Sequence, residues 1–299
     1  MKIQNNKKSA IIKLAVVFLI IIAGQILTMN AAYYARVFEI DVPMALLIAV
    51  CELFTLLPAL IALRIDKENI LESLGFRKIR ISTLMLTLLL TVLSYPVFIF
   101  ANLFSQLFTT NIVLQASSQI AGSTFLTAVV AIIGPIVEEI VFRGYFFNKL
   151  KGIAPVVLSA IISAVLFGVF HLNLNQFCYA FAVGVIFALA NYVSGSIWVP
   201  MIIHCLINIF GLVALFLDRM SSDGMAAQVA EGAVEARLPM EQLLPAVGAY
   251  AVISLICIAL IRIVLKAIAK RQGNQEALDT LFAGKNKNAT NVSKLAHNA

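Results

Sequence analysis

The sequence predicts an all-α membrane protein, a fold class indicated by three observations. Of the 299 residues, 61% are hydrophobic and only 12% are charged, whereas a typical soluble domain carries about 25% charged residues. The apolar residues gather in stretches of about 20, the length that an α-helix needs to cross the hydrocarbon core of a bilayer. Lysines and arginines are concentrated in alternate connections between these stretches. We therefore expect a bundle of about eight transmembrane helices.

Eight apolar stretches are the candidate spans, at residues 10–29, 43–63, 81–106, 121–150, 153–172, 176–193, 196–217 and 242–267. The first follows a basic start, so a cleaved signal peptide is a competing interpretation, although we prefer a retained helix. The expected organisation is N-terminal helices 1–120 with a cytoplasmic connector 64–80, a core 121–217, an external loop 218–241, a last helix 242–270 and a flexible cytoplasmic tail 271–299. The connector is either a short interfacial helix or a plain loop.

The net charge of +7 could suggest a nucleic-acid partner, but its distribution along the chain indicates a lipid bilayer instead. Of the 22 lysines and arginines, all but Arg36, Arg219 and Arg237 fall on one side of the predicted spans. Cytoplasmic connections of membrane proteins carry this excess of positive charge. Both termini should therefore be cytoplasmic, in a multi-pass protein of the plasma membrane.

Three charged residues interrupt the fourth span, namely Glu138, Glu139 and Arg143. A single charge at the centre of a membrane helix costs roughly 2.5–3.5 kcal/mol, so such residues usually pair or serve a function. Glu139 and Arg143 are four residues apart and can pair along one helix face. Glu138 is rotated about 100° from Glu139 and is left free for another task. Gly134 and Pro135, one turn earlier, should loosen the helix.

Two later spans carry the other polar candidates, His171 at the end of one and His204 with Asn208 in the next but one. Counted at 1.5 Å per residue from the cytoplasmic ends of their helices, Glu138 and Asn208 both lie about 18 Å deep, with His171 at about 24 Å and His204 at about 12 Å. All four could meet near mid-membrane. Phe167, four residues before His171, can pack against the imidazole.

Each feature also has a structural interpretation. The glutamate and arginine pair could simply hold the bundle together, and a lone intramembrane histidine is often an interhelical hydrogen-bonding residue. Two histidines, a free carboxylate and an asparagine at matched depth favour chemistry instead.

The ordered motifs Glu138-Glu139-x-x-x-Arg143, Phe167-x-x-x-His171 and His204-x-x-x-Asn208 closely resemble those of the CPBP family, also called Abi or type II CAAX proteases. These are intramembrane endopeptidases that include CAAX prenyl endopeptidases and bacteriocin-immunity proteins. Order, spacing and local contexts such as Glu-Glu-Ile-Val-Phe-Arg-Gly agree, over roughly residues 120–212. The flanking spans resemble the family only as generic membrane helices.

The resemblance implies hydrolysis of a peptide bond in a membrane-associated protein or peptide, in one of two ways. In the preferred version no metal is required: Glu138 and His171 activate a water, and His204 and Asn208 stabilise the oxyanion. In the other, His171, His204 and Glu138 bind Zn²⁺ or another divalent metal, which lowers the pKa of a bound water. Glu139, Arg143 and Phe167 would support the site in either version.

Two other classes of function stay open at this stage. One is a non-catalytic immunity or scaffold protein that binds its partner through residues 218–241. The other is a transporter in which Glu138, His171 and His204 relay protons, although no paired, interrupted repeats of the kind found in transporters are present. The sequence does not reveal the substrate, and a prenylated one becomes unlikely if the source is bacterial.

Overall fold

The computed structural model describes residues 2–221 and 224–283, and within them it contains helices and no strands. Seven helical segments are long and apolar enough to cross a membrane. They are α1 (Lys2–Val37), α2 (Met44–Ile65), α4 (Ile81–Ser105), a composite segment Thr124–Leu150, α11 (Leu174–Ser194), α12 (Trp198–Met220) and α14 (Met240–Gln272). An eighth, α10 (Val156–Phe170), is apolar but shorter. The predicted all-α membrane fold is confirmed, and the chain is a multi-pass membrane protein.

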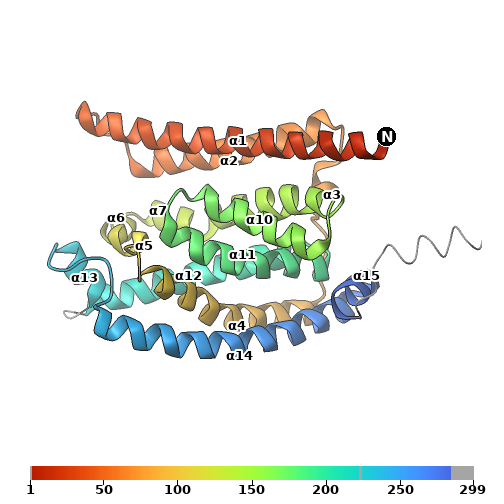
Figure 1. Ribbon diagram of the computed structural model, residues 1–299. Coiled ribbons are helices and arrows are strands. Elements are labelled where there is room, and N and C mark those ends of the chain that lie inside the picture. Colours follow the sequence, from red (N-terminus) through yellow and green to blue (C-terminus); the bar gives the residue numbers. More distant parts are fainter. Residues whose placement is uncertain (1, 222–223, 284–299) are drawn as a thin grey trace, which may run out of the picture.

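The helices lie side by side in layers (Figure 1). The pair α1 and α2 forms one side of the molecule, α4 and α14 form the other, and α10, α11 and α12 lie between them. Two apolar clusters hold these layers together. One joins α4, α11, α12 and α14 around Phe187 and Ile203, and the other joins α1, α2 and α10 around Phe142 and Phe167.

The fourth span is a stack of short helices rather than one regular α-helix. It consists of α7 (Thr124–Ala128), the π-helix η1 (Val129–Ile133), α8 (Gly134–Glu139), the π-helix η2 (Ile140–Phe147) and α9 (Asn148–Leu150). The predicted loosening at Gly134 and Pro135 is confirmed, because the first π-helix ends immediately before them. Wider turns of this kind are frequent at functional sites. Here they flank the two glutamates.

The fifth span is shorter than the predicted 153–172, since α10 has only 15 residues. At 1.5 Å per residue it is about 22 Å long, against a hydrocarbon core of about 30 Å. The helix ends where Leu172 adopts a left-handed conformation with φ of 54°. Asn173 then caps the next helix by accepting from the backbone N–H of Gln176. His171 consequently lies at a helix end inside the membrane layer.

Short helices cover the two ends of the bundle. At one end lie α5 (Ile112–Gln115), α6 (Ser117–Ala121) and α13 (Met225–Ala230), and at the other lie α3 (Ile70–Leu74), α15 (Gln275–Ala277) and the π-helix η3 (Leu278–Phe282). The connector therefore contains the short helix that we considered, capped by Asn69.

The expected flexible tail from 271 differs from the structure over its first part. The helix α14 continues to Gln272, and Asn274 donates from Nδ2 to the carbonyl of Tyr192 at 2.7 Å. Leu278, Leu281 and Phe282 then pack against the apolar cluster of α4, α11, α12 and α14. These apolar side chains explain the order of residues 274–282. The rest of the predicted tail, residues 284–299, lies outside the described residues.

Candidate active site

The predicted site residues come together in the bundle interior, where α8, α10 and α12 meet. Its centre is a fully buried ion pair. Glu139 and Arg143 have side chains that are 0% exposed, and Arg143 Nη1 donates to Glu139 Oε1 at 2.7 Å. The predicted pairing along one helix is thus confirmed. The guanidinium lies over the rings of Phe167 at 4.4 Å and Phe187 at 5.1 Å, so cation–π contacts add to the ion pair.

His204 is the second partner of the same carboxylate. Its Nδ1 lies 2.9 Å from Glu139 Oε1. Because a carboxylate paired with arginine is an acceptor, we assign the proton of this hydrogen bond to Nδ1. The rings of Phe167 and Phe187 lie 5.6 Å and 5.0 Å from the imidazole and hold its orientation. Glu139 therefore positions His204, a role that the sequence did not indicate.

The opposite nitrogen of His204 faces the other glutamate. His204 Nε2 lies 3.6 Å from Glu138 Oε2, which is too long for a direct hydrogen bond. A water placed beside the two atoms could hydrogen-bond to both. No ion pair joins Glu138 to Arg143 among the described residues. Glu138 thus has no arginine or lysine partner among the described ion pairs, whereas Glu139 accepts from both Arg143 and His204 through Oε1.

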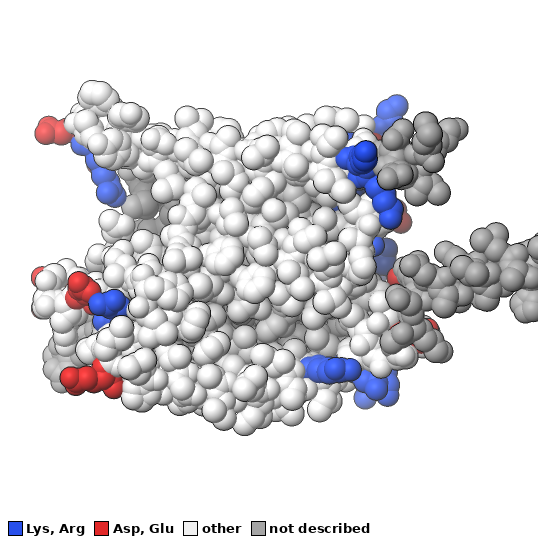
Figure 2. Space-filling view, viewed as in Figure 1, with Lys and Arg blue, Asp and Glu red and all other residues white. Residues whose placement is uncertain are grey.

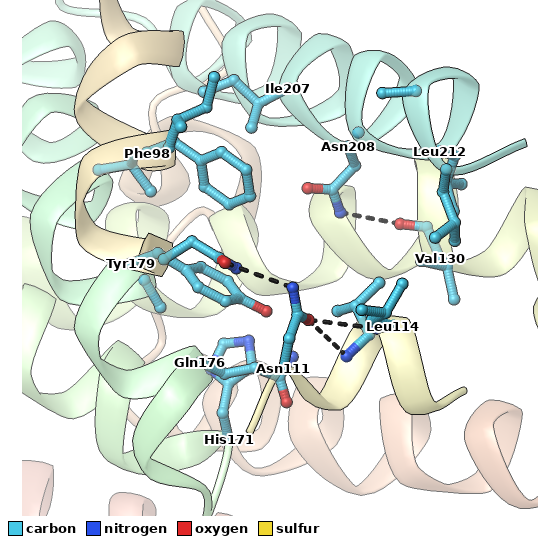
Figure 3. A pocket seen from close by; sticks show the side chains of 18 of the residues that line it. Phe98, Asn111, Leu114, Val130, His171, Gln176, Tyr179, Ile207, Asn208 and Leu212 are labelled. Atoms are coloured by element: carbon cyan, nitrogen blue, oxygen red, sulfur yellow. Dashed lines mark hydrogen bonds between the residues drawn. The ribbon is translucent and has the colours of Figure 1, made fainter. Parts of the chain in front are cut away.

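His171 enters the same region from the end of α10. Its Nδ1 lies 2.9 Å from the carbonyl oxygen of Phe167, which can only accept, so Nδ1 carries a proton and Nε2 remains available. The Phe167 ring contacts the imidazole edge to face at 5.0 Å. This confirms the predicted packing of Phe167 against His171. Figure 3 shows the imidazole at the edge of the cavity, beneath Asn111.

Asn208 holds a carbonyl group that the helix break leaves without a partner. Its Nδ2 donates to Val130 O at 2.9 Å (Figure 3). In the π-helix, Gly134 N–H bonds to Val129 O, five residues back. The next donor in that pattern would be residue 135, but it is proline and has no N–H. Asn208 therefore satisfies a backbone group that would otherwise be costly in a membrane. Its second amide hydrogen remains for another acceptor.

Glu52 on α2 is a site residue that sequence reasoning missed. It lines the same cavity as Glu138, and its Oε2 is buried with no hydrogen-bond partner among the described residues. A Cβ on Gly134 would lie 3.1 Å from Glu52 Oε1. Because Gly134 has no side chain, the Glu52 carboxylate can approach the helix at this position, one turn before Glu138. An acidic residue inside the apolar stretch 43–63 was the available signal.

The cavity has a volume of about 610 Å³, within the range of about 300–1,000 Å³ found for small-molecule sites. Glu138, His171, His204 and Asn208 all line it. Phe98, Ile207 and Leu212 give it apolar walls (Figure 3). The structure thus brings the four residues predicted as catalytic to one cavity.

His171, His204 and Glu138 are chemically suited to hold a divalent metal, since two imidazoles and a carboxylate form a familiar zinc ligand set. The described residues nevertheless include no group of three such side chains placed to hold a metal ion together. The Nδ1 atoms of both histidines bond to oxygen acceptors, which leaves each Nε2 free. Because the three side chains do not converge on one point in this structure, we derive no chemical step through a metal.

The segment that holds these motifs matches a known protein family. Residues 120–210 match the family described as type II CAAX prenyl endopeptidase Rce1-like. This segment resembles the Rce1-like family. The resemblance drawn from the three motifs is thereby confirmed, over a range close to the one that the motifs indicated.

Two bacterial relatives resemble the chain. The "Putative membrane peptidase YdiL" of Bacillus subtilis is 35% identical over 83 residues, which cover 28% of this chain and 34% of the relative. The "Membrane-embedded CAAX protease MroQ" of Staphylococcus aureus is 39% identical over 93 residues, 29% of this chain and 37% of the relative. The chain thus matches about a third of the length of each relative. No solved structure gives a significant match.

Proposed function

We propose that this protein is an intramembrane endopeptidase that hydrolyses a peptide bond of a membrane-associated protein or peptide. The observation that carries the proposal is the placement of Glu138 and His204 on opposite sides of a 3.6 Å gap at the wall of the cavity. The Rce1-like segment and the name of the relative MroQ support the class of reaction.

The first step is attack by water on the scissile carbonyl. Glu138 is the general base, and His171 Nε2 accepts a second hydrogen bond that orients the same water. A base within hydrogen-bond reach of its water contributes typically 10²–10⁴-fold to such a reaction. The proton moves to Glu138 as the water oxygen bonds to the carbonyl carbon, and the carbonyl oxygen becomes an oxyanion.

The oxyanion needs donors placed where its charge develops. Asn208 supplies the amide hydrogen that Val130 does not use, and His204 supplies Nε2–H when its imidazole is protonated. The Glu139 carboxylate, 2.9 Å from Nδ1, holds the imidazole in place. When the tetrahedral intermediate collapses, the carbon–nitrogen bond breaks and Glu138 returns its proton to the leaving amine. Two chains result, a new carboxyl terminus and a new amino terminus.

The experiment that tests the proposal compares peptide termini in the membrane proteome of cells that express the wild type, Glu138→Gln or Glu231→Gln. Glu138→Gln preserves shape but removes the base. Glu231 lies in the loop between α12 and α14 and is exposed, so its variant is the matched acid-to-amide control. We expect termini that appear with the wild type and the control but disappear with Glu138→Gln at equal amounts of folded protein.

Identical profiles for all three strains would contradict the proposal. A non-catalytic immunity or scaffold function would then be the better interpretation. Gel filtration of the purified variants shows whether each one is folded.

A further inference from the structure

We infer that the cavity receives an extended, apolar peptide segment from the membrane face opposite the cytoplasm. This inference rests on the proposed endopeptidase function and names the side from which its substrate arrives.

The cavity reaches only one end of the bundle. From the site it extends to Gln106 at the end of α4, to Asn111 and Leu114 at α5, and to Asp218 and Leu238 at the borders of the loop between α12 and α14. At the opposite end, no described residue of the connector, of the turn between α9 and α10, or of α15 and η3 lines it. The opening therefore lies at the end that carries α5, α6 and α13.

The loop between α12 and α14 builds the rim of this opening. Asn111 N donates to Ala236 O at 2.7 Å, and Leu238 N donates to Gln106 Oε1 at 3.2 Å. These bonds tie the loop to the start of α5 and to the end of α4. The helix α13 within the loop also contacts α5 and α6. A loop without any chemical signal in its sequence thus becomes part of the entrance.

Charge identifies the membrane face on which the rim lies. Among the lysines and arginines of the described residues, only Arg36, Arg219 and Arg237 belong to connections at the rim end. The basic residues gather at the opposite end, beside α3 and α15 (Figure 2). There Lys13 pairs with Asp66 and Lys149 pairs with Glu68. Because the positive end of a membrane protein faces the cytoplasm, the rim faces away from it.

The lining indicates the chemistry of the segment that enters. Asn102, Gln106, Asn111 and Gln176 place amide side chains among apolar ones in the lining, and Figure 3 shows Asn111 and Gln176 beside Leu114 and Tyr179. Amides both donate and accept, as a peptide backbone requires. The lining includes three acidic residues, Glu52, Glu138 and Asp218, and no lysine or arginine. This balance disfavours acidic segments and free carboxyl termini, and it favours an internal apolar segment of an exported or membrane-anchored peptide.

A cysteine probe tests the side of access without requiring cleavage. Gly211 lines the cavity, and a Cβ added there would have no neighbour within 4 Å. We would introduce Gly211→Cys into a chain whose native cysteines, Cys51, Cys178, Cys205 and Cys257, are replaced by alanine. Arg80→Cys, at the exposed basic end, is the matched control. Each variant is treated with a membrane-impermeant methanethiosulfonate reagent, in intact cells and in inside-out vesicles.

We expect the reagent to label Gly211→Cys in intact cells and Arg80→Cys only in inside-out vesicles. A trimethylammonium reagent should also react with Gly211→Cys at least about tenfold faster than a sulfonate reagent, relative to Arg80→Cys, because charge-lined clefts concentrate ions of opposite sign. Labelling of Gly211→Cys only in inside-out vesicles, or from neither side, overturns the inference, as does a faster sulfonate reaction.

The outcome is separable from the proposed function. Labelling is repeated with Glu138→Gln present, when no cleavage can occur, and the pattern should not change. A protein without any peptidase activity could still open to this face. Conversely, a protease whose cavity is labelled only from the cytoplasmic side would disprove this inference while leaving the proposed function intact.

Discussion

Replacing Glu139 by glutamine should destabilise the protein strongly, and the structure gives the size of the effect. The Glu139 carboxylate is the only acidic partner of Arg143 among the described ion pairs, and both side chains are fully buried. Breaking a buried ion pair costs about 3–5 kcal/mol, because it leaves an uncompensated charge. The aromatic faces of Phe167 and Phe187 contribute about 0.5–2 kcal/mol to a cation, which is too little to replace the carboxylate.

A double variant separates the cost of the unpaired charge from other causes. When Arg143→Met is combined with Glu139→Gln, neither member of the pair is charged any longer, and removing a whole buried pair costs far less than removing one partner. We therefore expect the double variant to recover most of the lost stability. It should nevertheless remain inactive, since His204 no longer has a carboxylate to hold its Nδ1.

The assay is reversible unfolding of the purified variants in detergent micelles, analysed as a double-mutant cycle. Glu241→Gln, at an exposed position of α14, is the control and should leave stability unchanged. The reasoning would be refuted by a cost below about 1 kcal/mol for Glu139→Gln. It would also be refuted if the double variant were no more stable than the single one.

Three further predictions concern packing, pH and metal. Gly184→Ala should lower the free energy of unfolding by about 1–3 kcal/mol, because its Cβ would lie 3.0 Å from Arg143 Nη2. Thermal unfolding measures this effect. The control Gly248→Ala, whose Cβ meets no neighbour within 4 Å, should cost less. Burial alone would raise the pKa of Glu68, but hydrogen bonds from Lys149 and Ser73 outweigh it and lower the pKa below its ordinary value. The pair of Glu68 and Lys149 should therefore contribute up to about 1 kcal/mol of stability at pH values above about 4.3, the pKa of glutamate in the unfolded state. That stability is lost as the pH falls through the folded pKa, so the destabilisation by Glu68→Gln in unfolding measurements should be largest near pH 7 and should shrink as the pH falls below about 4.3. Finally, peptidase activity should survive dialysis against a chelator; loss of activity that only Zn²⁺ restores would contradict the preferred metal-free mechanism.

Much of the fold follows from the sequence because hydropathy alone determines where membrane helices lie. The spans at 81–106 and 196–217 agree with α4 and α12 to within a few residues. The span at 153–172 is less accurate, because its end depends on the left-handed turn at Leu172. Apolar character does not reveal such a turn. The order of residues 274–282 depends on contacts with α11 that no local pattern displays.

The site was predictable where its residues share a helix and less so where they do not. Spacing alone was enough to pair Glu139 with Arg143. Depth counting placed Glu138 about 18 Å and His204 about 12 Å deep, near enough to meet close to mid-membrane, and they lie 3.6 Å apart. It did not show that Glu139 also holds His204, since that contact depends on how α12 is rotated against α8. Glu52 was missed for the same reason, because only packing turns its carboxylate towards Gly134.

The bond between Asn208 and Val130 has a consequence for the evolution of such sites. Asn208 is needed at this carbonyl because residue 135 is a proline, so the two positions form one unit although they lie 73 positions apart in the chain. Related chains that carry another residue at position 135 regain an N–H for the carbonyl. In such chains an asparagine at position 208 should be kept only if the reaction needs it. An alignment of such chains would show the two positions varying together wherever the backbone bond, rather than the reaction, maintains the asparagine.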